Sequence, residues 1–259
     1  MKINFIILQI SLLVTFSIGE WIEKRDTRLP LELRVANEGL AHDDNHWYLT
    51  NKHFLYQTTV SPITITNTNY QAIPSELQSL TYNHIGDIDI LDGIIYGGLE
   101  AKEGNGALAT WDTKTLEMQS YKITDQKDMP WVAIDPDTML LWSLPWGECC
   151  AFNIWNSTTL ELHDTFKMPD GVELPKEIQG GAFYKGDLYL SSNINDAVWK
   201  MVRSTAELSM EVSDIYRNHE YEMEGLDFWD LREIGLGTMH MYGNFMQLKE
   251  KAIHHYDDV

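Results

Sequence analysis

The chain has 259 residues, of which 44% are hydrophobic and 11% aromatic, and this is enough apolar material for the core of a globular protein of one or two domains. Its formal net charge of -20 at pH 7 repels phosphate backbones and anionic headgroups, which excludes nucleic acid and acidic membranes as partners. Such acidity is compatible with cation binding and equally with solubility alone.

Residues 1–19 have the pattern of a secretory signal peptide. Lys2 precedes a long apolar run, and Ser17 and Gly19 have the small-x-small spacing of a signal-peptidase site. An uncleaved anchor is the alternative, because the run approaches the length of a short membrane span. We expect cleavage, a secreted or extracellular mature protein of residues 20–259 that forms one domain, and no membrane span after cleavage.

Five segments of the mature chain share one pattern: a polar or glycine-rich opening, an apolar strand, a turn of Asp, Gly or Asn, and an aromatic-rich second strand. Turns of this composition are typical of tight hairpins. The segments open at Glu38, Gly86, Pro130, Gln179 and Glu224, at spacings of 48, 44, 49 and 45 residues. A period in this range built of short strands is typical of a β-propeller with about four strands per blade.

The repeat therefore predicts an all-β, five-bladed β-propeller with about 45 residues per blade. Residues 30–259 leave no room for a sixth blade. The last repeat lacks an obvious fourth strand, and we expect residues 24–36 to supply it and close the ring. A two-sheet sandwich is the alternative fold, but it does not predict five matching openings.

With this repeat the chain resembles secreted and cell-surface β-propellers over nearly the whole mature sequence. Five-bladed members of that class include calcium-activated nucleotidases, plant-type glutaminyl cyclases, several glycosidase families and a lectin. The six-bladed lactonase and phosphotriesterase group is similar in having an opening glutamate and calcium. WD-type signatures are absent, and no catalytic motif of these families matches residue by residue. The resemblance implies the architecture and leaves the activity open.

The opening residues of the repeats are the first candidate site, because the first strand of each blade lines the central channel of a propeller. The expected oxygen groups there are Glu38, Asp87, Gln179 and Glu224. Oxygen ligands from several strands suit Ca²⁺, so we expect a central calcium. The alternative is that a glutamate followed by glycine, as at Glu38 and Glu224, binds backbone amides of the neighbouring blade and locks the ring without an ion. In an enzyme, Glu38, Asp87 or Glu224 would act as base, and His84 would shuttle a proton.

Further side chains are expected to contact a ligand on the same face of the ring. Asn193 and Asn195 follow an inner strand, although asparagine is also favoured in turns for its own sake. Tryptophans in strands are more often core residues than ligand platforms. The expected ligand contacts are Trp131, Trp146, Gln179, Asn193 and Asn195, with Asn51 and Glu100 as other polar groups on that side.

Cys149 and Cys150 are the two cysteines of the chain and are adjacent. Consecutive Cα atoms lie about 3.8 Å apart, below the usual disulfide range of about 4.4–6.8 Å. The secretory route is oxidising and no third cysteine exists, so we expect a vicinal disulfide. It would lie on a blade-face loop and form the floor of a ligand site with Trp146 and Trp155 as walls, or else merely stiffen a turn. The nearby sequon predicts glycosylation at Asn156.

The sequence favours a secreted protein that binds a small polar or sugar-like ligand on its axial face, because no G-x-S-x-G motif or recognisable Ser/His/Asp set is present. The alternative is a calcium-assisted hydrolase or cyclotransferase of the phosphoester, lactone or glycoside class that uses the axial carboxylates. A third possibility is an extracellular scaffold that binds another protein through its blade edges.

Overall fold

The computed structural model is built almost entirely of antiparallel strands. The described residues are 21–29, 31–33, 38–194, 196–213, 222–229, 239–244 and 252–258. The signal peptide predicted at residues 1–19 and the candidate ligand residue Asn195 lie outside them. Within these ranges, no helix has the length and apolar character needed to cross a membrane.

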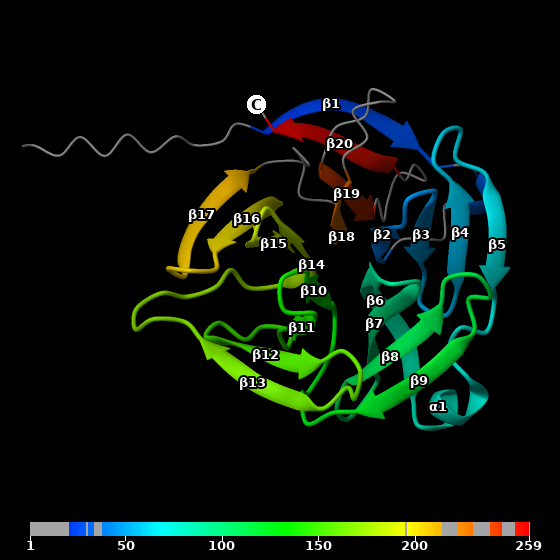
Figure 1. Cartoon of the computed structure of the whole chain (residues 1–259), viewed down its shortest axis with the longest axis horizontal. Coiled ribbons are helices and arrows are strands. Elements are labelled where there is room, and N and C mark those ends of the chain that lie inside the picture. Colours follow the sequence, from blue (N-terminus) through cyan, green and yellow to red (C-terminus); the bar gives the residue numbers. More distant parts are fainter. Residues whose placement is uncertain are drawn as a thin grey trace, which may run out of the picture.

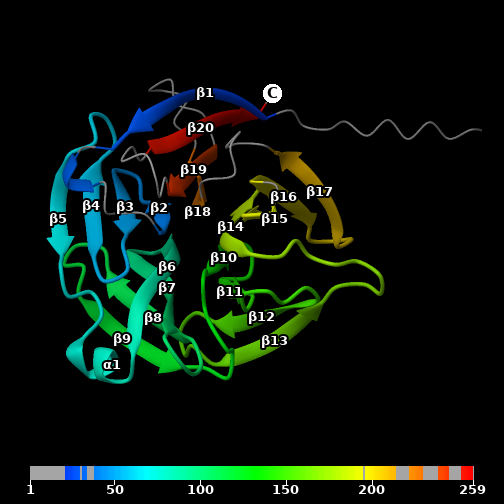
Figure 2. The ribbon, with the colours of Figure 1, turned by 180° about the vertical axis from the view of Figure 1, so that it is seen from behind.

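Hydrogen bonds join the strands into five four-stranded sheets, which form a ring around one axis (Figures 1 and 2). The first sheet comprises β2 (Leu40–His42), β3 (His46–Thr50), β4 (Leu55–Thr59) and β5 (Ile65–Asn69). The second comprises β6 (Tyr82–Leu91), β7 (Ile94–Ala101), β8 (Ala107–Asp112) and β9 (Met118–Ile123). The third comprises β10 (Ala133–Asp135), β11 (Leu140–Ser143), β12 (Ala151–Asn156) and β13 (Leu162–Lys167). The fourth comprises β14 (Ile178–Tyr184), β15 (Asp187–Ser192), β16 (Ala197–Val202) and β17 (Glu207–Val212).

Each of these four sheets is one blade, whose strands follow one another along the chain from the axis to the rim (Figure 1). The innermost strands β2, β6, β10 and β14 coincide with the openings of the sequence repeats. The β-propeller prediction is confirmed. A short helix, α1 (Ser75–Ser79), lies in the connection between the first two blades and buries Leu77.

The fifth sheet combines strands from the two ends of the sequence. Its members are β18 (Glu222–Phe228), β19 (Met239–Asn244), β20 (Ala252–Asp258) and β1 (Trp21–Arg28). β1 pairs antiparallel with β20, from Trp21 opposite Asp258 to Arg28 opposite Ala252. The predicted closing strand at residues 24–36 was therefore misplaced: it starts at Trp21, and Leu31–Leu33 form a 3-10 helix. Pro30 in the sequence explains the early end, because proline has no N–H for the ladder.

The turns between the third and fourth strands show why the blades repeat. In the second blade the N–H of Leu116 donates to the carbonyl of Asp112, and in the third blade Leu160 donates to Asn156, both at 2.8 Å. The side-chain oxygens of Asp112 and Asn156 accept further N–H groups of the same turns. Leu116 and Leu160 close the turns with positive φ of 59° and 56°. An Asp or Asn at the end of the third strand thus builds the same turn in both blades.

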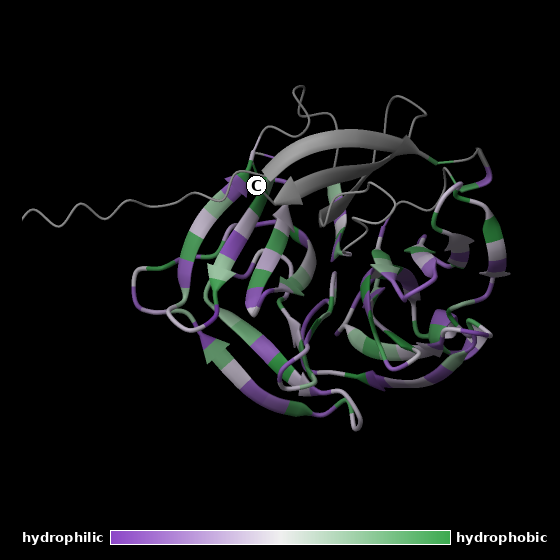
Figure 3. Cartoon of the chain, turned by 45° about the horizontal axis from the view of Figure 1, so that its top comes forward, coloured by the Kyte–Doolittle hydropathy of each residue, from purple (hydrophilic) through white to green (hydrophobic). Residues whose placement is uncertain are grey.

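The core lies between neighbouring blades rather than in one central cluster. Along the strands, hydrophilic and hydrophobic residues alternate (Figure 3), as expected for sheets that pack face to face. Between the first two blades, the indole N–H of the fully buried Trp111 donates to the carbonyl of Ala72 at 2.8 Å. Between the third and fourth blades, Trp131, Trp142 and Phe152 pack together. Apolar packing thus fixes each blade against the next and leaves the axis to polar groups.

Candidate functional site

The innermost strands all begin at the same face of the ring, which we term the start face. Because neighbouring strands run in opposite directions, the loop after the second strand of each blade returns to this face. These loops include residues 51–54, 102–106 and 144–150. The topology therefore places the opening residues, Glu100 and the cysteine loop on one side of the molecule, as predicted.

Asp87 occupies the centre of the axis and binds the backbone of the other sheets. Its Oδ1 accepts the N–H of Leu40 in the first sheet at 3.0 Å. Its Oδ2 accepts the N–H groups of Gly181 and Leu226, in the fourth and fifth sheets, at 3.2 Å each. Its own N–H donates to the carbonyl of Pro130, which precedes the third inner strand, at 2.9 Å. Burial raises the pKa of Asp87 well above its ordinary value, and the amides oppose that shift.

Glycines at the openings allow this close approach. A Cβ on Gly180 or Gly225 would lie 2.6 Å from a carboxylate oxygen of Asp87, and one on Gly39 would lie 2.7 Å from its Cα. Side chains cannot stand at such distances from neighbouring atoms. The repeated residue-glycine openings of the sequence therefore serve the lock around Asp87. The sequence alternative to an ion gave such a lock to a glutamate followed by glycine, whereas the backbone amides are bound here by Asp87.

Beside this lock, Glu38, His84 and Glu100 form a carboxylate–histidine–carboxylate array. His84 Nε2 lies 2.8 Å from Glu38 Oε2, and His84 Nδ1 lies 3.5 Å from Glu100 Oε2. His84 stands on β6 and Glu100 opposite it on β7, in register across the hairpin. The side chain of Glu38 is only 6% exposed, whereas those of His84 and Glu100 are 27% and 24% exposed. The array is therefore anchored at Glu38 and open to a ligand at the other two groups.

The electrostatics of the array favour a protonated histidine. Burial opposes protonation of His84, but the hydrogen bond and charge of Glu38, with the charge of Glu100, outweigh it and raise the pKa of His84. The pKa of Glu100 is also raised, by burial first and then by the charges of Asp128 and Glu38, although His84 opposes the shift. Two titratable groups with raised pKa values, His84 and Glu100, are thus partly exposed on the array.

Asp128 connects the array to the cysteine loop, because its charge acts on Glu100 and its side chain binds the backbone of the loop. Asp128 Oδ1 accepts the backbone N–H of Trp146, whose side chain is 41% exposed. Cys149 and Cys150 of the same loop form the vicinal disulfide that the sequence predicts. The loop is held to the connection between β13 and β14, because the carbonyl of Cys149 accepts an N–H group from that connection at 2.8 Å. An exposed indole and a rigid ring therefore lie on the same face as the array.

The other candidates on this face have mainly structural contacts. Trp131 is fully buried, and its ring packs against Gly181, so it is a core residue in this structure. Asn193 accepts the N–H of Met223 at 2.8 Å and joins the fourth sheet to the fifth. Glu224 is buried, and its carbonyl accepts the hydroxyl of a serine on β15. Gln179 is half-buried beside them. The ligand roles proposed for these residues stay predictions.

Comparisons with known proteins bear on the fold. No family model matches the chain, and no curated protein matches it by sequence. Among solved structures, the glutaminyl cyclase of Myxococcus xanthus aligns with a TM-score of 0.68 at 12% identity, over 93% of this chain and 97% of that one. The PQQ-bound aldose sugar dehydrogenase of Streptomyces coelicolor aligns with a TM-score of 0.52 at 8% identity, over 92% and 98%. The chain shares the β-propeller fold of these structures. At these identities the likeness shows the fold alone.

The calcium predicted for this propeller stays a prediction. In the described part of the chain, no group of three or more His, Cys, Asp or Glu side chains is arranged to hold a metal ion. Both oxygens of Asp87 already accept backbone amides. An ion at the axis would therefore have to draw on oxygens other than those of Asp87.

The opposite end of the axis holds a second titratable cluster, which the sequence analysis missed. His42 Nδ1, at the end of β2, lies 2.6 Å from Asp227 Oδ2 of β18, and the ring of His42 stacks on Trp229 at 4.4 Å. Asp89 lies nearby and accepts the N–H of Ile134 at 2.7 Å. The sequence contains a pattern that could have predicted this cluster: polar residues alternate along the inner strands, as in Asp87-Ile-Asp89.

The charges of this cluster interact strongly. Burial raises the pKa of Asp89 to about 7, and the charge of Asp227 adds to the shift. For His42, burial lowers the pKa, but the charge and hydrogen bond of Asp227 outweigh it, so that the pKa is raised. One carboxylate is thus kept protonated up to neutral pH beside an ion pair that joins the first and fifth sheets.

Proposed function

We propose that the start face binds a small polar ligand that carries a protonated amine. One observation carries this proposal: beside the axial lock, His84 lies between the carboxyl groups of Glu38, at 2.8 Å, and Glu100, at 3.5 Å, and the side chains of His84 and Glu100 are partly exposed. Small-molecule sites typically combine a concave scaffold with a few convergent polar groups of perturbed pKa.

The charges around the array favour a cationic ligand. His84 neutralises one carboxylate, while Glu100 and Asp128 both have raised pKa values because of burial. A raised carboxyl pKa means that nearby positive charges and hydrogen-bond donors do not fully offset the loss of water around the carboxylate. An ammonium group placed between Glu100 and Asp128 supplies that compensation and lowers both pKa values, so binding should be accompanied by release of protons.

Trp146 gives the ligand an apolar contact. Its side chain is 41% exposed, although its backbone is fixed by Asp128. An indole face attracts both the apolar body of a ligand and a nearby cation. The vicinal disulfide in the same loop keeps this wall short and rigid, so that little ordering is needed on binding.

Calorimetric titration tests the binding proposal. The probe is a dipeptide amide with an N-terminal glutamine, compared with its Nα-acetylated form, which lacks the cation. We expect the free amine to bind and the acetylated form not to bind. Glu100→Gln should weaken binding about tenfold through loss of a charged hydrogen bond. Glu76→Gln, at an exposed position on α1, is the matched control and should leave binding unchanged. Equal binding of both probes would refute the proposal.

The alternative is a cyclotransferase that acts on N-terminal glutamine. Its support is the exposed carboxyl of Glu100 with a raised pKa beside His84, which suits proton transfer, together with the similarity of fold to a glutaminyl cyclase. In this reaction the α-amine attacks the side-chain amide carbon, a ring C–N bond forms, and ammonia leaves. Glu100 would take the proton from the amine and return it to the leaving nitrogen.

Release of ammonia from the same dipeptide amide distinguishes the two functions. A cyclotransferase gives stoichiometric ammonia and a pyroglutamyl product, and Glu100→Gln should reduce kcat about a hundredfold or more, the usual contribution of a general acid–base group. If the dipeptide amide binds but no ammonia is released, the result supports the binding function and rules out the cyclotransferase.

We also infer that the fifth sheet is a fifth blade, because its four strands pair in the same antiparallel manner as the others and close the ring through β1. Secretion and glycosylation remain proposals. The Oδ1 of Asn156 accepts turn amides, whereas in the described part of the chain its Nδ2 has no hydrogen bond, which suits a glycosylation acceptor.

A further inference from the structure

The first and fifth sheets meet where the ring closes, and we term this contact the closing seam. At the start face, the N–H of Gly225 donates across the seam to the carbonyl of Glu38 at 2.8 Å. At the opposite end of the axis, Nδ1 of His42, on β2, lies 2.6 Å from Oδ2 of Asp227, on β18. The first of these bridges joins uncharged groups, whereas the second contains an imidazole, which ordinarily titrates near neutral pH.

The packing around the histidine bridge fixes its geometry. The ring of His42 stacks on Trp229 at a centroid distance of 4.4 Å, and Trp229 meets Trp47 of β3 edge to face at 4.7 Å. The side chains of His42 and Asp227 are 23% and 11% exposed. Water therefore reaches the imidazole and can exchange its proton, while the low exposure of the carboxylate keeps the interaction between the two charges strong.

Carboxylates face His42 from three elements of the fold. Asp227 is on β18, Asp89 is on β6 of the second blade, and Asp43 follows His42 directly and lies 3.2 Å from His46 of β3. Burial lowers the pKa of His42, but the charge and hydrogen bond of Asp227, with the charges of the other two carboxylates, outweigh burial and raise it. The ion pair is therefore complete at mildly acidic pH and is lost as pH rises through the raised pKa.

Two other seams contain ion pairs whose cation stays charged in this pH range. Between the third and fourth blades, Arg203 pairs with Asp135 and with Asp137, the latter at 2.7 Å. Between the second and third blades, Lys122 pairs with Glu161. Guanidinium and ammonium groups lose their protons only well above pH 9, so these seams do not respond to a change near neutral pH.

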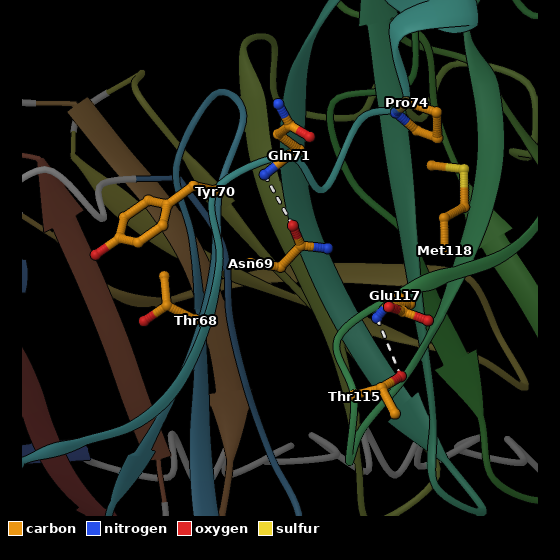
Figure 4. A pocket seen from close by; sticks show the side chains of 8 residues that line it. All are labelled: Thr68, Asn69, Tyr70, Gln71, Pro74, Thr115, Glu117 and Met118. Atoms are coloured by element: carbon orange, nitrogen blue, oxygen red, sulfur yellow. Dashed lines mark hydrogen bonds between the residues drawn. The ribbon is translucent and has the colours of Figure 1, made fainter.

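The seam between the first two blades has bridges of uncharged groups. Asn69 Nδ2 donates across it to the carbonyl of Leu116 at 2.7 Å, beside the turn that carries Thr115 (Figure 4). The indole N–H of Trp111 also donates across it, at 2.8 Å. His84 contacts this seam as well, but its titration leaves these bridges in place.

We propose that the closing seam is a pH-dependent latch, which the ion pair of His42 and Asp227 holds shut at mildly acidic pH and which opens locally above neutral pH. Loss of the imidazolium leaves carboxylates of the first, second and fifth sheets facing one another, and a hydrogen bond from a neutral imidazole is about half as strong as a charge-assisted one. The latch does not depend on the ligand proposed for the start face. The sheet that loosens is the one that combines strands from both ends of the chain.

Hydrogen exchange of the full chain, followed by NMR at pH 5.5, 7 and 8.5 and corrected for the intrinsic rate, tests the latch. The N–H of Gly225 reports on the closing seam, and the indole N–H of Trp111 reports on the first two blades. We expect the protection of Gly225 to fall about tenfold between pH 5.5 and 8.5, the factor that separates a charge-assisted from a neutral hydrogen bond. The protection of Trp111 should stay constant.

Three variants assign the effect to the histidine bridge. His42→Asn removes the titratable group, and its amide can donate from nearly the same place as Nδ1, so the protection of Gly225 should lose most of its pH dependence. Asp227→Asn should lower the pKa of His42, measured from the imidazole chemical shifts, because it removes the charge that raises it. His163→Asn, at an exposed position on β13, is the matched control and should keep the pH profile of the parent.

Two results would overturn the proposal. One is equal protection of Gly225 in the parent at pH 5.5 and 8.5, which can be measured without any variant. The other is an undiminished fall in His42→Asn, because a group other than His42 would then control the seam.

Discussion

Asp89→Asn tests the electrostatics of the cluster at the end of the axis that lies opposite the start face. Burial and the charge of Asp227 raise the pKa of Asp89 from its ordinary 3.8 to about 7. In the unfolded chain Asp89 is ionised above pH 4, whereas in the folded chain it stays protonated until about pH 7. The folded state therefore loses stability as pH rises through this window and loses no more above it.

The size of the effect follows from the shift. A change from 3.8 to about 7 corresponds to up to about 4 kcal/mol, at 1.36 kcal/mol for each pKa unit, and partial exposure of the side chain reduces it. Asparagine removes the charge but can accept only one of the two backbone N–H groups that Asp89 binds, those of Ile90 and Ile134, which costs about 1 kcal/mol. We expect the variant to be more stable than the parent at pH 8, by about 2–3 kcal/mol.

Urea denaturation at pH 4.5, 6 and 8 measures this difference. At pH 4.5 the variant should be equal to the parent or about 1 kcal/mol less stable, so the two stability curves cross as pH rises. Asp170→Asn, at an exposed position, is the control and should follow the parent at every pH. Parallel pH profiles for Asp89→Asn and the parent would refute the reasoning.

Two further predictions concern the axis. Gly180→Ala should destabilise the protein by about 2 kcal/mol or more, because its Cβ would lie 2.6 Å from both Asp87 Oδ2 and the carbonyl of Glu224. Thermal unfolding measures the loss, and an unchanged Tm would contradict the close packing around Asp87. If the axis binds calcium, a hundredfold excess of Ca²⁺ over Kd should add about 2.7 kcal/mol and Glu224→Gln should abolish the gain; identical Tm values in Ca²⁺ and EDTA would exclude the ion.

The fold was predictable from the sequence because its signals are local and repeated. The openings recur at a nearly constant spacing, and the turns after Asp112 and Asn156 depend on hydrogen bonds within a few residues, such as that from Leu116 to Asp112. The position of the closing strand was less predictable, since β1 pairs with residues at the far end of the sequence. No local pattern specifies such a partner.

The sequence predicted which residues lie at the axis, but not which of them contact a ligand and which bind backbone amides. Glu38, His84 and Asp87 were all named, yet whether a carboxylate faces a ligand or a backbone amide depends on the register of four separate sheets. Asp87 binds amides of three other sheets, while Glu100, a secondary candidate, faces His84 across a hairpin.

The pairing of β1 with β20 sets an order of events during synthesis. Residues 21–28 are made before the other strands of the ring, but their partner, residues 252–258, follows all of them along the chain. Until then β1 has no neighbour in its ladder, and an unpaired strand is open to pairing with other chains. The first four blades can assemble from consecutive strands meanwhile. Completion of the ring is therefore a late, long-range step, and chaperones that shield the amino-terminal segment should raise the yield of folded protein.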